Sequence, residues 1–420
     1  MSGYYLIVYG CQMNKADAGR IASVFEFNKI KQAENLKEAR YVIIIACSVR
    51  QSAVNRIYGQ VKNLLPLKKM GAKLILTGCL LKKDAVKLNK FFDLIIKIDD
   101  IKDLAKKLKI VGKKTITKNY LDLKPKIGKS TTVYVPISSG CNNFCSYCVV
   151  PYTRGQEYSR SAKFIIKEIK GLIKHGVKNI ILIGQNVNSY KDKKTDFNSL
   201  LKKINGIKDD FFLHFITNHP KDTSFELLKT MKTCKKIGHY LHLPVQSGSN
   251  RILKLMNRHY TISEYKQIIK RARLLMPDIN ISTDIIVGFP TETEQDFKLT
   301  AALMKEARFD MVYIAEYSPR GQTIAYAKFK DNVSPKIKAQ RRIILTEILK
   351  KTALKNNSKL IGKNLDVLLE KQNKDYFYGR TKNFKKIRIK INDERPCRLN
   401  KITKIKITKA APWALEGKPI

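Results

Sequence analysis

The first part of the chain alternates short apolar runs with amphipathic segments. The runs YYLIVYG (4–10), YVIIIA (41–46) and KLILTG (73–78) are almost continuously apolar, which is typical of strands that are buried on both faces. The segments between them, 16–28 and 53–69, have the spacing of amphipathic helices. Strands that alternate with helices in this way predict a parallel sheet in an α/β domain, to which we assign residues 1–120.

A second and longer series of the same kind follows, and we assign it to residues 128–355. Helical segments separate its six apolar runs, which are VYVPIS, NIILIG, FLHFIT, YLHLPV, INISTDIIV and MVYIAEY. Six such units predict an incomplete (βα)6 barrel, in which the chemistry lies on the loops after the strands. Polar and glycine-bearing clusters stand at those places, namely GQNVNSY, TNHP, QSGS, GFPTE and SPRG.

The last segment, residues 356–420, has a different pattern. After a helical stretch that ends near Gly362, short alternating runs occupy 364–371, 376–381, 385–392 and 402–410. Such runs with polar turns predict a small β-barrel. Basic and aromatic residues are mixed between 376 and 388, which suits looped or single-stranded RNA. The alternative is a solvated, lysine-rich barrel whose aromatic residues form its core.

Composition and charge narrow the class of protein. The 420 residues are 44% apolar, enough for several cores, and 82 Lys and Arg against 35 Asp and Glu give a net charge of +47. This excess favours a nucleic-acid partner, although a lysine excess along a whole chain also arises from genome base composition. No basic leader with an apolar run opens the chain, and its apolar runs are shorter than the about 18 residues of a membrane span. We therefore expect a cytoplasmic protein that does not enter a membrane.

The cysteines of the first domain share one structural position. Cys11, Cys47 and Cys79 each come at the end of one of its three strands. Parallel strands end at the same edge of a sheet, where open α/β sheets bind ligands, so we expect the three thiols to converge. A turn residue or helix start beside each thiol would stabilise a thiolate. The alternative, three buried core cysteines, leaves the shared position unexplained.

A second set of three cysteines lies in one loop, after the first strand of the predicted barrel. Cys141, Cys145 and Cys148 are spaced C-x3-C-x2-C, with the aromatic Tyr147 before the last. No second C-x2-C pair is present to complete a tetrahedral zinc site, whereas a 4Fe–4S cluster held by three thiolates keeps one iron open. The spacing resembles the radical S-adenosylmethionine enzymes, in which that iron binds S-adenosylmethionine. Cys234 and Cys397 lie outside both sets, and we interpret them as ordinary thiols.

The resemblance extends over almost the whole chain. The motifs YGCQMN, ACSVR, TGC, GCNNFCSYCVVPYTRG, GQNVNSY, HLPVQSGS, STDIIVGFPTETEQDF and YSPRG are similar to those of the methylthiotransferase family. The chain has Ile45 and Ala46 where the family has Asn and Thr before the cysteine, and KADAGRI (15–21) departs from N-x-x-D-S-E. These departures leave the ligand cysteines intact but bear on the surroundings of the first three.

The resemblance implies two 4Fe–4S clusters and S-adenosylmethionine as cofactors. Cys11, Cys47 and Cys79 would hold the second cluster, and residues 356–420 would be a TRAM domain. The implied reaction is radical methylthio insertion at C2 of N6-isopentenyladenosine beside the anticodon of tRNA. Other members of the family act on threonylcarbamoyladenosine in tRNA or on an aspartate of a ribosomal protein, and both remain alternatives.

Further site residues are expected after the strands of the barrel. By the resemblance, Tyr147, Gln185 and Gln246 lie where S-adenosylmethionine is bound, and Asp284 bonds the cofactor or the substrate. Arg154 meets the cofactor carboxylate or a tRNA phosphate. For each of the two glutamines, a loop amide that bonds only to neighbouring backbone is an equally open alternative. His214, His219, His239 and His242 also lie on or near strand ends. We interpret these as structural and assign no catalytic base.

The expected partners are the anticodon stem-loop of tRNA and a reductant protein such as flavodoxin or ferredoxin, with the chain acting as a monomer. Two alternatives of other classes remain. An iron–sulfur RNA-binding regulator would bind RNA without cleaving S-adenosylmethionine, and a zinc protein would be colourless.

Overall fold

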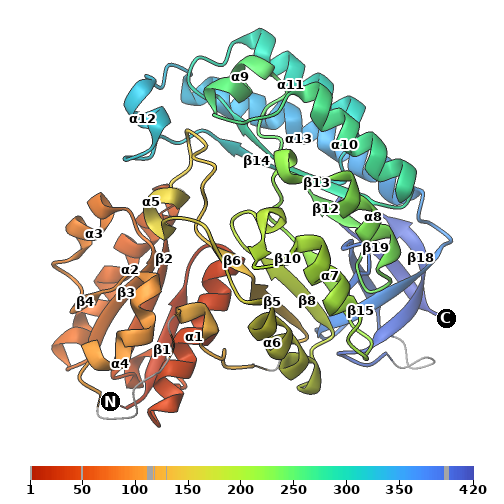
Figure 1. Ribbon diagram of the computed structural model, residues 1–420. Coiled ribbons are helices and arrows are strands. Elements are labelled where there is room, and N and C mark those ends of the chain that lie inside the picture. The colour runs from red at the N-terminus through yellow and green to blue at the C-terminus, as the bar shows by residue number, and fades with distance from the viewer. Residues whose placement is uncertain (1, 49–50, 111–116, 118, 129, 392–396) are drawn as a thin grey trace. The chain divides into compact units, whose positions relative to one another are not determined.

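The computed structural model describes residues 2–48, 51–110, 117, 119–128, 130–391 and 397–420. The chain forms two compact units, each assembled from separate stretches (Figure 1). The first unit contains Met1–Gly128, Pro136–Phe164 and Ser318–Lys328, and the second contains Lys129–Val135, Ile165–Tyr317 and Phe329–Ile420. The domain limits 1–120, 128–355 and 356–420 stay predictions, because each of these units joins stretches that are distant in sequence.

The first unit is built on a parallel sheet of four strands in the order β1-β2-β3-β4. Its strands are β1 Tyr4–Val8, β2 Tyr41–Cys47, β3 Lys73–Cys79 and β4 Leu94–Ile95. Its helices are α1 Gln12–Phe27, α2 Gln51–Lys69, α3 Lys82–Leu88, α4 Leu104–Lys107, α5 Val150–Arg154 and α12 Ile324–Lys328. The three strands and two helices expected from the apolar pattern are therefore present.

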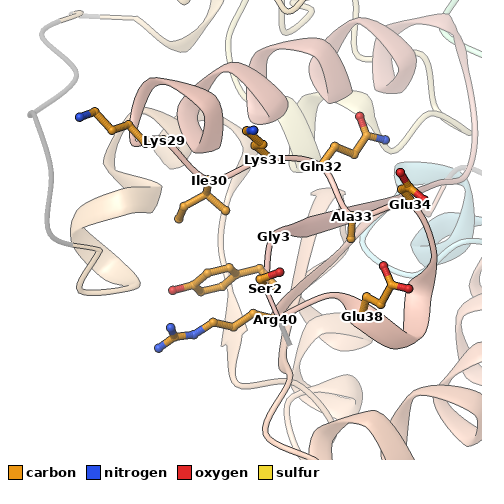
Figure 2. A pocket seen from close by; sticks show the side chains of 11 residues that line it. Ser2, Gly3, Lys29, Ile30, Lys31, Gln32, Ala33, Glu34, Glu38 and Arg40 are labelled. Atoms are coloured by element: carbon orange, nitrogen blue, oxygen red, sulfur yellow. The ribbon is translucent and has the colours of Figure 1, made fainter.

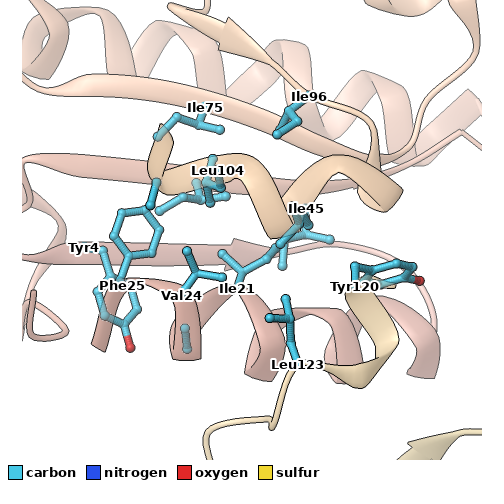
Figure 3. Packing of buried hydrophobic residues seen from close by; sticks show 14 of the residues in the cluster. Tyr4, Ile21, Val24, Phe25, Ile45, Ile75, Ile96, Leu104, Tyr120 and Leu123 are labelled. Atoms are coloured by element: carbon cyan, nitrogen blue, oxygen red, sulfur yellow. The ribbon is translucent and has the colours of Figure 1, made fainter. Parts of the chain in front are cut away.

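Helices cover both faces of this sheet. On one face, Ile21, Val24 and Phe25 of α1 pack with Ile43 and Ile45 of β2 (Figure 3). On the other face, alternate residues of β2 pack against α2 in a second cluster that includes Val42, Ile44, Ile57 and Leu64. Because both faces are buried, every residue of β2 is buried, which explains its continuously apolar sequence.

The rest of the first unit consists of short elements. A two-stranded pair joins β6 Ser138–Ser139 to β7 Tyr158–Ser159, on either side of the loop with Cys141, Cys145 and Cys148. The 3-10 helices are η1 Leu36–Glu38, η2 Ile98–Asp103 and η3 Tyr120–Asp122. Tyr120 of η3 is buried at one end of the apolar cluster of Figure 3.

A hollow of about 580 Å³ opens beside the first residues of β1 and β2. Figure 2 shows its lining side chains, among them Lys29, Gln32, Glu38 and Arg40. Ser2 and Gly3 precede β1, and Arg40 precedes β2, so the hollow lies at the amino ends of these strands. Cys11, Cys47 and Cys79 lie at the opposite ends. The hollow and the three cysteines therefore lie at opposite edges of the sheet.

The second unit contains the six strands expected of the barrel, as two three-stranded sheets with the orders β11-β8-β5 and β12-β13-β14. These strands are β5 Thr132–Pro136, β8 Asn179–Ile183, β11 Phe212–Phe215, β12 Tyr240–His242, β13 Asn280–Val287 and β14 Met311–Glu316. β12 is shorter than the run YLHLPV, because the regular pairing stops after the Leu243 N–H, which donates to the Ser282 carbonyl. The next N–H on this side, that of Val245, donates to the Thr283 hydroxyl instead of to the backbone of β13. Parallel pairing joins β11 to β8, β12 to β13 and β13 to β14.

Helices connect these strands. They are α6 Ala162–Lys174, α7 Phe197–Asn205, α8 Phe225–Thr233, α9 Asn250–Leu255, α10 Ile262–Leu275, α11 Glu294–Ala307 and α13 Pro335–Ser358. Smaller elements are η4 Val187–Ser189, η5 Pro220–Asp222 and the hairpin β9 Lys191–Asp192 with β10 Thr195–Asp196. Helices α10 and α11 each begin with a capping box, Thr261 with Glu264 and Thr293 with Asp296, which satisfies free N–H groups of the first turn.

The end of the chain forms a closed five-stranded barrel, as its alternating pattern predicts. The strand order is β15-β16-β17-β19-β18. The strands are β15 Asn364–Gln372, β16 Tyr376–Thr381, β17 Lys386–Lys390, β18 Ile402–Ala410 and β19 Leu415–Pro419. Alternate residues fill its core, including Val367, Phe377, Ile389 and Ile405.

The turn between β16 and β17 attaches this barrel to the rest of the second unit. The ring of Phe384 stacks on Tyr240, the first residue of β12, with centroids 4.5 Å apart. Lys385 Nζ lies 2.7 Å from Asp310 Oδ1, just before β14. The closed barrel therefore lies at the amino ends of these strands, away from the loops that follow them. Among the described residues, no helix has both the length and the apolarity to cross a lipid bilayer.

Candidate functional site

Three thiols meet at the carboxyl edge of the first unit's sheet. Cys47 and Cys79 are the last residues of β2 and β3, and they are register partners in the parallel pairing. Cys11 follows β1 as the N-cap of helix α1. Cys47 and Cys79 are 7% and 4% exposed, whereas Cys11 is exposed. The shared strand-end position predicted from the sequence is thus confirmed for all three.

Gly10, the residue before Cys11, lies in close contact with the side chain of Cys47. Gly10 has a φ of +107°, and a Cβ there would lie 2.6 Å from Cys47 Cβ and 3.2 Å from its Sγ. Only glycine accepts both this backbone angle and this approach. The absence of a side chain at position 10 therefore keeps the space beside the Cys47 sulfur open.

The innermost of these thiols has a distinct electrostatic setting. Burial raises the pKa of Cys79 to about 11, and Arg154 beside it lowers the pKa, while the nearby Cys11 and Cys47 sulfurs raise it further. The three sulfurs are thus close enough to influence one another. Binding of a metal cluster would replace their protons.

A buried arginine reaches this rim from another part of the first unit. Arg154 ends helix α5, which follows the loop with Cys141, Cys145 and Cys148. Its Nε donates to Cys79 Sγ at 2.9 Å, and its Nη2 pairs with Asp17 Oδ2 at 2.7 Å. Nη1 donates to the hydroxyl of Tyr120 at 3.1 Å. Both charged side chains of the Arg154–Asp17 pair are fully buried.

Asn14 connects the ends of two strands to this arginine. Its Nδ2 donates to the carbonyls of Tyr9 at 2.6 Å and Ala46 at 2.8 Å. Since both amide hydrogens are used, its Oδ1 faces Arg154 Nη2 at 3.2 Å. The bond to position 46 uses a backbone carbonyl, so Ala46 supplies it as a threonine would.

Asp84 links the SPRG cluster to the same edge of the sheet. Arg320 Nη2 donates to Asp84 Oδ2 at 2.8 Å, and the hydroxyl of Ser48, next to Cys47, donates to the same oxygen at 3.0 Å. Arg320 also bonds to Gln51 at the start of α2. Val49 and Arg50 of the ACSVR motif lie outside the described residues.

The second set of cysteines lies in a loop with a tightly fixed entrance. Gly140 has a φ of +75°, and a Cβ on it would lie 2.0 Å from the carbonyl oxygen of Gln156. The N–H of Cys141 donates to the Gly155 carbonyl at 3.2 Å. Two donors approach the sulfurs, Asn143 Nδ2 at 3.5 Å from Cys141 Sγ and the N–H of Val150 at 3.5 Å from Cys148 Sγ. Tyr147 is partly buried in this loop.

The donor atoms of both sets are thiols, which are the ligands that iron–sulfur clusters take. Each set offers three thiols. The first has an open space beside Cys47 and a helix N-terminus at Cys11, and the second has N–H donors directed at sulfur.

The expected residues of the barrel lie in the second unit. Gln246 has a φ of +70°, and its backbone bonds to β13 through N–H to Asp284 O and O to Ile286 N–H. Backbone strain of this kind is often found in functional loops. Asp284 Oδ2 lies 3.4 Å from His242 Nε2, and Gln185 is partly exposed after β8. Their proposed contacts with S-adenosylmethionine stay predictions.

The histidines occupy different settings. His214 is buried between Asn179 and the Lys382 carbonyl, 2.8 Å from each, while His219 caps η5. His239 lies 2.7 Å from Asp278. These three bond to neighbouring residues as structural histidines do, whereas His242 joins Asp284 and Ser282.

The sequence did not predict three residues that bond to Arg154 beside Cys79, namely Asn14, Asp17 and Tyr120. The spacing N-x-x-D in the first turns of α1 places Asn14 and Asp17 on one face of the helix, which was the available signal. Tyr120 carried none, because only the fold brings it to Arg154. The expected contact of Arg154 with a cofactor carboxylate or tRNA phosphate stays a prediction.

Comparisons with known proteins agree with this arrangement. Residues 135–304 match the radical SAM superfamily, and residues 3–97 match uncharacterized protein family UPF0004. The chain is 39% identical to the tRNA-2-methylthio-N(6)-dimethylallyladenosine synthase of Thermoanaerobacter sp., over 99% of this chain and 92% of that protein. It is 38% identical to the protein of the same name from Thermodesulfovibrio yellowstonii, over 98% and 97%.

Among solved structures, the radical S-adenosylmethionine methyltransferase TsrM from Kitasatospora setae has a similar fold. The TM-score is 0.56 at 12% identity, with 78% of this chain and 77% of that chain covered. The superfamily match implies a 4Fe–4S cluster and S-adenosylmethionine as cofactors. Given the full-length identity and the two sets of cysteines, the chain belongs to the tRNA-2-methylthio-N(6)-dimethylallyladenosine synthase family of radical S-adenosylmethionine methylthiotransferases.

Proposed function

We propose that this protein inserts a methylthio group at C2 of N6-isopentenyladenosine, next to the anticodon in tRNA. The single observation that carries the proposal is the full-length likeness to synthases of that modification, at 39% identity over 99% of the chain. The positively charged C-terminal barrel and the net charge of +47 support a tRNA partner.

Two cysteine sets divide the chemistry. Cys141, Cys145 and Cys148 would hold the cluster to which S-adenosylmethionine binds, and that cluster would supply the electron for the radical chemistry that removes hydrogen from the base. Cys11, Cys47 and Cys79 would hold a second cluster, which would supply the sulfur. The rim geometry and the glycine at position 10 support this second site.

The other predicted site residues bind and orient S-adenosylmethionine. Tyr147, Gln185, Gln246 and Asp284 contact S-adenosylmethionine, and the base to be modified is unstacked to reach the site. A small reductant protein such as flavodoxin or ferredoxin supplies electrons. The protein acts as a monomer in the cytoplasm, where tRNA and the reductant are available.

Single cysteine variants test whether the two cysteine sets have these separate roles. Purified, anaerobically reconstituted protein is mixed with S-adenosylmethionine, dithionite and tRNA that carries isopentenyladenosine, and 5′-deoxyadenosine and methylthio nucleoside are measured. We expect Cys145→Ala to lose both products. Cys47→Ala should lose the methylthio nucleoside but still form 5′-deoxyadenosine. Cys234→Ala, outside both sets, should retain both. Methylthio product from Cys47→Ala would contradict the role of the second cluster.

The alternatives give different outcomes. A sister enzyme would modify tRNA carrying threonylcarbamoyladenosine, or the ribosomal protein, in parallel assays. A non-catalytic iron–sulfur regulator would bind RNA without producing 5′-deoxyadenosine, and a zinc protein would contain no iron. In cells, a deletion strain should lack the methylthio adduct in its tRNA nucleosides by mass spectrometry. An undiminished adduct would refute the proposed function.

A further inference from the structure

The Arg154 guanidinium links both cysteine sets through one segment of the first unit. Arg154 lies in the helix that follows the loop of Cys141, Cys145 and Cys148, and its Nε is 2.9 Å from Cys79 Sγ, 75 positions away in sequence. The side chain is completely buried. A buried guanidinium is costly unless its charge is balanced and its N–H groups are bonded.

Its neighbours hold this guanidinium in a single orientation. Asp17 supplies the balancing charge at Nη2, Asn14 bonds to the same nitrogen, and Tyr120 accepts from Nη1. The orientation of Asn14 is itself determined, because its amide nitrogen already donates to two backbone carbonyls. With Nη1 and Nη2 fixed in this way, the remaining Nε–H is directed at the sulfur of Cys79.

The same network touches every strand end of the rim. Asn14 bonds to Tyr9 just after β1 and to Ala46 beside Cys47, while Arg154 bonds to Cys79. A purely structural ion pair between α1 and α5 would require neither the sulfur contact nor the bonds to the strand ends. Asp17 Oδ1 is also buried without a hydrogen-bond partner in the described part of the chain. The Arg154–Asp17 ion pair therefore does more than join α1 to α5, because its network also bonds to Cys79 and to the strand ends beside Cys11 and Cys47.

We propose that Arg154 is a positioning residue of the second cluster, which donates a charge-assisted hydrogen bond to its Cys79 ligand. This inference rests on the two-cluster proposal above. Hydrogen bonds to ligand sulfurs and nearby charge set cluster potentials. A reduced cluster carries one more negative charge, so the guanidinium stabilises the reduced state and raises the potential. The electron comes from an external reductant, and no atom is transferred.

A variant that keeps only the second cluster makes this bond observable. In Cys141→Ala/Cys145→Ala/Cys148→Ala, reconstituted and reduced with dithionite, pulsed EPR compares protein grown with and without ¹⁵N-arginine. We expect a guanidinium ¹⁵N coupling to the reduced cluster. This comparison needs no substitution at position 154, so its outcome does not depend on whether an Arg154 variant folds.

Matched arginine variants then assign the coupling. Arg154 and Arg160 are each 3% exposed, but Arg160 pairs with Asp122 and the Pro136 carbonyl. In the same background, Arg154→Lys should lose the coupling and shift the midpoint potential to lower values in a dithionite titration. Arg160→Lys should keep both. Absence of coupling in the labelled parent, or its persistence in Arg154→Lys, would overturn the inference.

The outcomes separate this inference from the proposed function. A triple variant that binds no iron overturns the second cluster and the Arg154 inference together. Bound iron without ¹⁵N coupling overturns only the inference. A coupling that is present while intact protein leaves isopentenyladenosine in tRNA unmodified refutes the proposed function and supports the inference.

Discussion

At the scale of single residues, small residues beside Cys11 and Cys47 determine the space and the hydrogen bonds around these thiols. Gly10 leaves room for the Cys47 sulfur, and the alanine at position 46 contributes only its carbonyl, which accepts from Asn14. Position 46 therefore tolerates the departure from the family's threonine. Position 10 does not tolerate a side chain, because both its backbone angle and its close neighbour exclude one.

Gly10→Ala should therefore impair the second cluster selectively. The new Cβ would overlap Cys47, at a cost of about 1–3 kcal/mol for overpacking in addition to backbone strain. Gly71→Ala is a matched control, since Gly71 has a φ of +95° but nothing within 4 Å of an added Cβ. Urea denaturation and iron per chain measure both effects. Equal stability loss and full iron content in both variants would contradict the prediction.

His214 should make the protein sensitive to acid. Burial lowers its pKa to about 4, and the charges of Arg380 and Lys382 lower it as well, while the Lys382 carbonyl opposes the shift. Between pH 6.5 and 4 the unfolded chain binds a proton that the folded chain does not, so stability falls as pH falls through this window. The expected loss is about 3 kcal/mol at pH 4.

His214→Gln should flatten this part of the stability profile in urea denaturation between pH 7 and 4. The control is His175→Gln, since His175 is exposed at the end of α6. An unchanged slope in His214→Gln would show that other groups cause the acid sensitivity.

At the scale of elements, the QSGS loop is shaped by helix α11. The Gly248 N–H donates to Thr300 Oγ1 at 2.9 Å, and Ser249 Oγ donates to Asp296 Oδ1 at 2.6 Å. A Cβ on Gly248 would lie 2.5 Å from Thr300 Cα. Side chains of helix α11 therefore hold the loop through the Gly248 N–H and the Ser249 hydroxyl, close to the strained Gln246.

Gly248→Ala should displace this loop and weaken S-adenosylmethionine binding at least several-fold, by isothermal titration of the reconstituted protein. Gly171→Ala serves as control, because Gly171 lies in α6 with open space around it. That change should stabilise by about 0.5–1 kcal/mol and leave binding unaltered. Unaltered binding in Gly248→Ala would argue against a cofactor role for this loop.

At the scale of the whole molecule, the net charge of +47 has two explanations, tRNA binding and a general lysine excess. Strand β18 offers a test between these two explanations. Ile405 and Ile407 fill the core of the closed barrel, whereas Lys404 and Lys406 alternate with them on its outer face. If the barrel binds RNA phosphates, these lysines release counterions on binding.

Lys404→Glu/Lys406→Glu should weaken tRNA binding and reduce the slope of log Kd against log salt by about 1.5–2. Lys163→Glu/Lys170→Glu makes the same charge change on exposed positions of α6. Filter binding at several salt concentrations compares the two. If both variants behave alike, the charge acts through the whole surface and not through the barrel.

The sequence by itself determined the elements and the position of the thiols. Apolar runs with period two or helical spacing are local properties, so the strands of both units, the closed barrel and the strand-end cysteines followed from them. The two sets of three cysteines were also readable, because C-x3-C-x2-C is contiguous and parallel strands end at one edge.

Only the tertiary structure decided what surrounds those thiols. Arg154 was expected near a cofactor or phosphate, yet its partners Cys79 and Asp17 are 75 and 137 positions away. Such pairs depend on the register and packing of distant segments, which no local pattern encodes. For the same reason the chain divides into units made of separate stretches, with the cysteine loop grouped with the N-terminal sheet. Apolar periodicity specifies each element, whereas a buried polar network exists only when all its elements are assembled.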